Sequence, residues 1–374
     1  MLNNVHGLLF TQSNIYNLRE LTEPRCLSSI PFGGRFRMID FMLSNPPYGK
    51  NWKTDAEKMG GKTGILDSRF NAYLDGGEEL KMIPSLRDGQ LLFLLNNVTK
   101  MKDGDDAPLG SRIAEVHNGS SLFTGDAGSG ESNARRYLIE RDLVEAIIAL
   151  PTNMFYNTPI GTYIWVLSNR KADNRKGVIQ LIDARVMKSP LRRNLGKKNC
   201  ELTSELQQRI VDAFLSMNES DISRILPNSE FGYWSISVER PLRLRVFPRR
   251  PIPEDIFKKA RDRQAVEKAL ADIPNNTPLD NWTLFAQALG LNKTLLKKLR
   301  PLITEVDPAA APIEGEADPN LSDTEIVPFN YPGGIDSFVE NEVHPFAPDA
   351  FVDSAKTKIG YEIDFAKYFY TPAH

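Results

Sequence analysis

The chain has 374 residues, of which 41% are hydrophobic and 25% charged, a composition typical of a soluble globular protein with two or three domains. Its formal net charge of −2 neither favours nor excludes a nucleic-acid partner, so any phosphate contact must come from local clusters of cations. Two cysteines and four scattered histidines exclude a disulfide framework and show no metal-ligand spacing, and the lack of a signal peptide or long apolar run predicts a cytoplasmic chain without a membrane partner.

The first 44 residues carry a pattern of their own. The string Ile30-Pro-Phe-Gly-Gly-Arg-Phe-Arg-Met-Ile-Asp-Phe41, preceded by Leu18–Arg25, resembles the amino terminus of glucose-1-phosphate adenylyltransferase, and it is closest to the non-catalytic, regulatory branch. The early phosphate-binding loop of that family is rich in glycine, whereas Leu8–Asn14 contains none. We therefore expect a foreign segment over residues 1–44 that does not transfer nucleotides, within a chimeric or truncated chain.

An apolar run, Phe36–Met42, predicts a buried strand that ends just before a stiff turn. Pro46 and Pro47 cannot donate backbone N–H groups, so they stop any strand ladder. Asn45 stands immediately before this break and Tyr48 immediately after it. The pattern places both side chains at the carboxyl end of a strand, where open α/β sheets bind their ligands.

The string Asn45-Pro46-Pro47-Tyr48 resembles the catalytic motif of DNA methyltransferases that modify an exocyclic amine, above all that of adenine. The resemblance implies that the Asn45 side-chain oxygen and the Pro46 carbonyl accept the amine hydrogens and localise the nitrogen lone pair. The prolines fix φ, so both acceptors are preorganised. Tyr48 would stack on a base flipped out of the duplex. The alternative is a proline-rich turn after an edge strand.

From Met42 onward the chain resembles the modification subunit of type I restriction–modification systems. The longest family-like string, Arg112–Asn133, predicts a strand, a tight turn and a glycine-rich loop that leads into a helix. Apolar spacing predicts that this helix extends over Ala134–Leu150. Its amino terminus would favour an anion, although no Gly-Lys-Ser/Thr follows the glycines. We expect His117 to be a hydrogen-bonded turn residue.

The segment Leu150–Ser168 predicts a strand end, a loop and a strongly β-prone strand. In amino-methyltransferases an aromatic residue after the sixth strand helps to bind the target base. The resemblance places Phe155 at that position, with Tyr156 beside it. An aromatic plug under the sheet edge is the alternative.

The segment Arg185–Lys198 holds six basic residues and no acidic one. Such a density of cations is typical of a surface that follows a DNA backbone, and surface solubility is the alternative. The six candidate DNA-binding residues are Arg185, Lys188, Arg192, Arg193, Lys197 and Lys198.

The remaining chain is divided by composition. Residues 45–198 would form the catalytic half of a methyltransferase domain, and residues 199–303 a mostly helical region. Residues 304–334 include an acidic stretch rich in Ala and Pro, which predicts a linker. Family-like sequence returns over residues 335–374.

Alternating strand and helix signals predict an α/β fold with a helical C-terminal region. The resemblance implies a Rossmann-like, S-adenosylmethionine-dependent methyltransferase sheet. We expect this sheet to be incomplete at its N-terminal half, because the glycine-rich turn and ribose-binding acid of a methyl-donor site are absent. The cofactor would be S-adenosylmethionine with an incomplete site, its binding residues stay unknown, and no metal site is expected.

The resemblance implies N6-adenine methylation of double-stranded DNA, within a complex that also contains specificity and restriction subunits. Two alternatives stay open. The chain could be an inactive DNA-binding or assembly remnant without a donor site, or a fragment similar to glucose-1-phosphate adenylyltransferase, which only residues 1–44 support.

Overall fold

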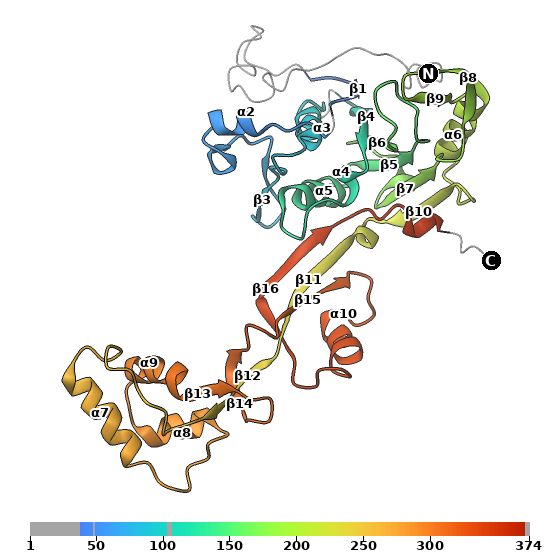
Figure 1. Ribbon diagram of the computed structural model, residues 1–374. Helices are drawn as coiled ribbons and strands as arrows, with labels where there is room; N and C mark the ends of the chain where they lie inside the picture. The colour runs from blue at the N-terminus through green and yellow to red at the C-terminus, as the bar shows by residue number, and fades with distance from the viewer. Residues whose placement is uncertain (1–37, 48, 103–106, 371–374) are drawn as a thin grey trace. The chain divides into compact units, whose positions relative to one another are not determined.

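A computed structural model describes residues 38–47, 49–102 and 107–370 (Figure 1). The chain forms two compact units. The first comprises the described residues up to Trp234, Pro328–Asn330 and the chain from Lys358 onward, and the second comprises Ser235–Val327 and Tyr331–Thr357. The expected adenylyltransferase-like segment, residues 1–44, lies mostly outside the described residues.

A six-stranded sheet forms the centre of the first unit, with the order β1-β4-β6-β5-β7-β10. Strand β1 is parallel to β4, β4 and β5 are both antiparallel to β6, and β5 is parallel to β7. Strands β1, β4, β5 and β7 therefore run in one direction and end at the same edge of the sheet, which we term the carboxyl edge. The strand bounds are β1 Phe41–Ser44, β4 Arg112–Asn118, β5 Val144–Ala149, β6 Thr162–Ser168, β7 Val178–Asp183 and β10 Ser223–Pro227.

Side chains alternate between the two faces of the sheet along each strand, and apolar side chains occur on both faces. Helices therefore cover both faces and bury these side chains. Helices α3 (Gln90–Val98) and α5 (Gly130–Glu140) contribute to one apolar core and α6 (Ser204–Ser216) to the other. The sheet and its two layers confirm the expected α/β class. Smaller elements complete the unit: α2 Lys53–Lys58, η4 Lys62–Gly64, β2 Asn71–Tyr73, β3 Glu79–Lys81, α4 Ser120–Phe123, η5 Asp173–Arg175, β8 Ser189–Leu195, β9 Lys198–Glu201, η6 Asn228–Phe231 and η8 Lys367–Phe369.

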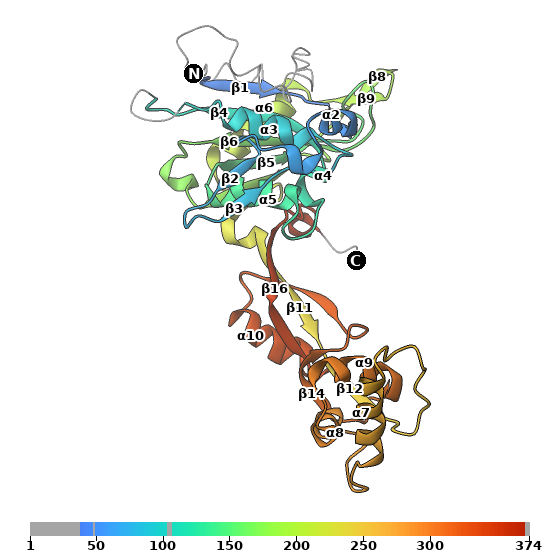
Figure 2. The same ribbon diagram turned by 90° about the vertical axis from the view of Figure 1, so that its left-hand side faces the viewer.

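Strand β1 lies at one border of the sheet (Figure 2). Met42 points into the core, whereas Phe41 is 70% and Leu43 47% exposed. Within the described ranges no strand pairs with the outer edge of β1.

The helix expected over Ala134–Leu150 is wrong in its second half. Helix α5 ends at Glu140, a turn follows with Asp142 at φ 52°, and Val144–Ala149 is strand β5. All six residues of β5 are buried. A short apolar run that is buried on both faces has no period that separates strand from helix, so the apolar spacing was misleading.

The second unit has its own core around helices α7 (Ala260–Ala271), α8 (Trp282–Leu289) and α9 (Lys293–Ile303). These helices confirm the helical character expected late in the chain, but strands surround them. Strand β12 (Pro241–Val246) pairs with β13 (Thr304–Val306) and β14 (Pro312–Ala317). The chain enters this unit within β11 (Gly232–Glu239) and leaves it within β16 (Phe351–Tyr361), and these two strands form a sheet with β15 (Asp323–Pro328). Helix α10 (Gly334–Phe338) and the π-helical turn η7 (Val339–Val343) complete it.

The linker expected over residues 304–334 is wrong, because strands β13, β14 and β15 lie there. Ile313 packs into the core of the second unit and Ala310 is buried. Three acidic side chains of this segment form ion pairs: Glu305 with Arg250, Asp307 with Arg245, and Glu316 with Arg300 at 2.6 Å. Composition therefore indicated a solvated segment, whereas strand pairing and the burial of Ile313 and Ala310 make it part of the folded unit.

No helix in the described ranges is long and apolar enough to cross a membrane. The same residues contain no group of three histidine, cysteine or carboxylate side chains that could bind a metal ion.

Candidate functional site

The turn after β1 is the centre of the candidate site. The parallel pairing of β1 with β4 places Ser44 opposite Glu115, so Asn45 follows at the carboxyl edge. Asn45 and Pro47 are exposed and Pro46 is buried between them. Tyr48 lies outside the described residues.

Strand directions bring the other sequence-predicted residues to the same edge. The loop with Phe155 follows β5, and Arg185 follows β7. Strands β4 and β6 separate β1 from β5, so three strand spacings, roughly 14 Å, lie between the ends of β1 and β5. The fold thus gathers onto one edge residues that are far apart in the sequence.

A buried polar cluster lies directly beneath the turn, and we call Ser44, Asn97, Glu115 and His117 the β4 cluster. The Ser44 hydroxyl donates a hydrogen bond to Oε2 of Glu115. The Asn97 amide donates to the same oxygen at 2.7 Å and to the Ser44 hydroxyl at 3.2 Å. Nε2 of His117 lies 2.7 Å from Oε1 of Glu115.

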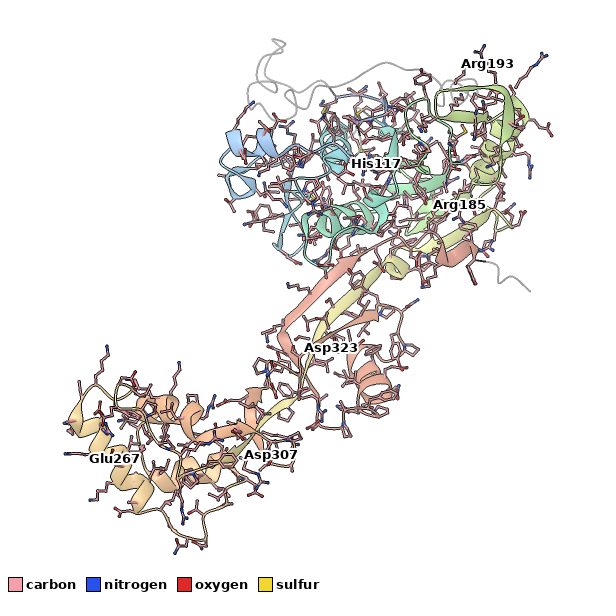
Figure 3. All side chains as sticks on the ribbon, viewed as in Figure 1. His117, Arg185, Arg193, Glu267, Asp307 and Asp323 are labelled. Carbon is pink, nitrogen blue, oxygen red and sulfur yellow. The ribbon has the colours of Figure 1, made fainter. Side chains whose placement is uncertain are left out.

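His117 does not lie in a turn, as the sequence suggested, but within β4, where its ring is fully buried 5.9 Å from the ring of Trp165 (Figure 3). Its Nδ1 has no hydrogen-bond partner among the described residues. Sequence reasoning missed Asn97 and Glu115. The available signal was that Glu115 and His117 share one face of β4 with the buried Ile113, so two polar side chains interrupt an apolar face.

The glycine-rich loop before α5 serves packing. A Cβ on Gly130 would come within 1.8 Å of the Ile83 carbonyl oxygen, so the backbones touch there. Ser129 caps α5, and the buried Glu131 places a carboxylate in its first turn, where it accepts a hydrogen bond from the Ser85 N–H at 2.6 Å. Because a negative charge already occupies this helix terminus, the loop is not a site for an anion.

The aromatic pair after β5 is divided between core and surface. Phe155 is half-buried and packs against the core on the α6 side of the sheet. Tyr156 is 66% exposed. The two rings at the predicted base-binding position therefore differ in their access to a ligand.

The basic segment forms the hairpin β8–β9, which is hydrogen-bonded to the loop that carries Phe155. The Lys197 N–H donates to the Tyr156 carbonyl at 2.8 Å, and the Asn153 amide donates to the Lys197 carbonyl at 3.0 Å. Gly196 adopts φ +61°, and an added Cβ would come within 2.7 Å of the Tyr156 carbonyl oxygen. The structure thus joins two sequence-predicted features.

The cations of the hairpin differ from Arg185. Lys188, Arg192, Arg193 and Lys197 are exposed, Lys198 is half-buried, and none forms an ion pair with another described residue; Arg193 extends away from the hairpin (Figure 3). Arg185 instead binds Asp183 at 2.7 Å and lies over the Phe365 ring at 5.7 Å. Burial raises the pKa of Asp183, but the hydrogen bonds from Arg185 outweigh burial and lower that pKa overall.

A site for a methyl donor is not found among the described residues. Such a site needs a glycine-rich turn and an acidic residue at the carboxyl end of a strand beside β1. The described neighbour of β1 is β4, on the opposite side from the exposed edge. Residues 38–47, 49–102 and 107–370 therefore do not by themselves supply a site for S-adenosylmethionine.

Comparison with protein families gives a match to the model for N-6 DNA methylases over residues 5–240, more than half of the chain. The methylase subunit of the type I restriction enzyme HindI from Haemophilus influenzae is 44% identical over 171 residues, which are 46% of this chain and 31% of that protein. The MjaVIII methylase subunit from Methanocaldococcus jannaschii is 32% identical over 219 residues, 58% of this chain and 33% of that protein. The chain spans about a third of the length of such relatives.

A short, separate match is to the glycogen biosynthesis protein GlgD of Bacillus subtilis, 46% identical over 43 residues and covering 12% of each chain. Among solved structures, a type I methyltransferase subunit from Streptococcus thermophilus has a TM-score of 0.42 and 23% identity, covering 56% of this chain and 38% of that one. The sequence matches agree with both resemblances found in the sequence.

Proposed function

Because the chain belongs to the N-6 DNA methylase family, we propose that it is the modification subunit of a type I restriction–modification system and methylates N6 of adenine in DNA. The observation that carries this proposal is the exposed Asn45 at the end of β1, followed by the buried Pro46. These two consecutive residues would supply an amide oxygen and a backbone carbonyl at the edge of the sheet where α/β folds bind ligands.

The chemical role proposed for this chain is to make the exocyclic amine of adenine a better nucleophile. The exocyclic nitrogen of adenine is a weak nucleophile because its lone pair is delocalised into the ring. Oδ1 of Asn45 and the carbonyl of Pro46 accept its two hydrogens and return electron density to nitrogen. Proline fixes the backbone, so little reorganisation is needed when the base arrives. Tyr48 and Phe155 would contact the flipped base.

The β8–β9 hairpin is proposed to contact the DNA backbone. Four exposed cations without ion pairs among the described residues, namely Lys188, Arg192, Arg193 and Lys197, support this assignment, since phosphate contacts supply most of the sequence-independent affinity for DNA. Base sequence would be selected by a separate specificity subunit, and a restriction subunit would complete the assembly.

One observation favours a second function, that of a DNA-binding or assembly subunit without transfer activity. The family uses S-adenosylmethionine, yet the described residues present no site for it, and β1 leaves its outer edge unpaired within those residues. Such a chain would still contact DNA and other subunits.

The deciding experiment is digestion of adenine-containing duplex DNA after incubation with the purified chain, a cognate specificity subunit and S-adenosylmethionine, followed by mass spectrometry of the nucleosides. We expect N6-methyladenine with the wild-type chain and a loss of at least 100-fold with Asn45→Ala, the size of effect expected when a preorganised acceptor is removed. An exposed Asn51→Ala variant is the control.

A thermal-shift titration separates the alternatives. A chain with a donor site gains about 2.7 kcal/mol at a donor concentration of 100 times its Kd, whereas a chain without one gains nothing. No shift at millimolar S-adenosylmethionine, together with no methylated adenine, would leave the binding or assembly function. Stabilisation by ATP or glucose 1-phosphate would instead support the adenylyltransferase-like alternative.

A further inference from the structure

The β4 cluster is an unusual feature in an apolar layer of the first unit. Glu115 and His117 are fully buried on the face of β4 that also carries Ile113. Ile113 and Met42 belong to the large apolar core on this face. A carboxylate in such a place is costly unless hydrogen bonds compensate for the lost water. Ser44, Asn97 and His117 supply three contacts to it, so the network is satisfied at Glu115.

The cluster acts on the residue next to the proposed acceptor. Ser44 is the last residue of the four-residue strand β1, and Asn45 follows it. Beyond Asn45 the chain enters Pro46 and Pro47, neither of which has an N–H group to donate to a neighbouring strand. These two residues therefore cannot donate backbone hydrogen bonds that would fix the turn. The hydrogen bond from the Ser44 side chain to Glu115 is the last side-chain contact to β4 before the turn.

The three partners of Glu115 have different effects. Asn97 comes from helix α3 and bonds both Glu115 and Ser44, so it ties the end of β1 to the helix layer as well as to β4. His117 contacts the other carboxylate oxygen and so fixes the rotation of the carboxylate group about its bond to the chain. Oε2 is thereby presented to Ser44 and Asn97.

We propose that Glu115, Asn97 and His117 are positioning residues that act through Ser44 to orient Asn45 and Pro46 toward the target amine. This inference rests on the proposed function. None of the three needs to touch the base. Their role is to limit the movement of the Asn45 amide oxygen and the Pro46 carbonyl. The reaction rate depends on the position of these acceptors, since a displacement of 1 Å costs roughly 100-fold in rate.

The most direct test is Ser44→Ala, which removes one hydroxyl and leaves Glu115 with two partners. Ser44→Thr keeps the hydroxyl and is the rescue variant. The matched control is Ser223→Ala, because Ser223 is a buried serine on β10, the strand at the opposite border of the same sheet, and its hydroxyl accepts a hydrogen bond from Gln180 at 3.0 Å. Glu115→Gln is a second probe of the same network.

Hydrogen–deuterium exchange by mass spectrometry reports on the turn without any need for activity. In Ser44→Ala we expect the peptide spanning Phe41–Asn51 to exchange at least several-fold faster, while the urea midpoint stays near that of Ser223→Ala. Ser44→Thr should restore slow exchange. Unchanged exchange in both Ser44→Ala and Glu115→Gln would overturn the inference.

Methylation kinetics provide the second readout. We expect kcat of Ser44→Ala to fall by about 10- to 100-fold, with an unchanged KM for DNA. The kcat of the double variant Ser44→Ala/Glu115→Gln should be no lower than that of the more severely affected single variant, because the two residues belong to one network. Unchanged kcat in Ser44→Ala would overturn the proposed role. A wild-type chain that does not methylate DNA, but whose turn loosens in Ser44→Ala, would refute the proposed function and retain the anchoring of the turn.

Discussion

A single buried guanidinium, that of Arg135, joins three segments of the first unit. It donates to the carbonyls of Tyr361 at 2.5 Å, Thr124 at 3.0 Å and Ser121 at 3.2 Å. Burial lowers the pKa of Arg135 to about 10. Because each acceptor is a main-chain group, this side chain holds backbone from α4, from the glycine-rich loop and from β16 against helix α5.

We expect Arg135→Met to lower the free energy of unfolding by about 4.5 kcal/mol, equivalent to three charge-assisted hydrogen bonds of roughly 1.5 kcal/mol each. The carbonyls would be left buried without a donor. Urea unfolding followed by circular dichroism measures the change. Arg141→Met is the control. The Arg141 side chain is 44% exposed, it lies 3.9 Å from Asp75, and its hydrogen bond to the Tyr73 carbonyl at 3.0 Å is exposed to solvent, so its loss should cost less than about 1 kcal/mol. Equal costs for the two variants would refute the role of Arg135.

The β8–β9 hairpin shows how the fold separates cations that are neighbours in the sequence. The sequence shows only a dense run of cations from Arg185 to Lys198. The fold pairs Arg185 with Asp183 and leaves Arg192, Arg193 and Lys197 exposed beside the loop of Tyr156. Cations in the same run therefore have unequal access to a polyanion.

We expect the triple replacement of Arg192, Arg193 and Lys197 by Gln to weaken DNA binding and to reduce the slope of log K against log salt by about 0.9 for each phosphate that the variant no longer neutralises. Fluorescence anisotropy with a labelled duplex at several salt concentrations measures the slope. Replacing the exposed Lys293, Lys297 and Lys298 of α9 by Gln gives the same change in net charge elsewhere and should leave the slope unchanged. A similar fall in both variants would indicate only a general effect of charge.

At the scale of the whole molecule, the first unit is discontinuous in sequence. The chain returns to it at Lys358, and the N–H groups of Tyr361 and Ile363 then bond to Ser132 and Leu122 at 2.9 Å. Tyr361, Ile363 and Phe365 are buried in its core. The late segment is thus part of the same core as the sheet.

A chain that ends at Thr357 should therefore fail to fold its first unit. Loss of three buried side chains at about 1.5–3 kcal/mol each approaches the whole stability of a domain, about 5–15 kcal/mol. Loss of the cooperative transition in a thermal melt would show this. Tyr370→Ala is the control, because Tyr370 is 76% exposed. A cooperative melt of the shortened chain at the wild-type temperature would contradict the assignment.

The sequence by itself determined the features that depend on local pattern. The diproline break located the turn at Asn45, and strand β6 followed from a short run rich in β-branched residues. The family resemblance from Met42 onward was confirmed by the matches to type I methylase subunits. Each of these signals lies within a few neighbouring residues, so it can be recognised without knowledge of the fold.

The tertiary structure alone decided the features that join distant residues. The segment of β5 has an apolar spacing that suggested a helix, but it forms a strand that is buried on both faces. The expected linker instead contains strand β14, whose Ile313 packs into the core of the second unit. The β4 cluster brings Ser44 to Glu115 across 71 positions and Asn97 to Ser44 across 53. No local period encodes such a contact, because a buried hydrogen bond depends on which strands and helices become neighbours.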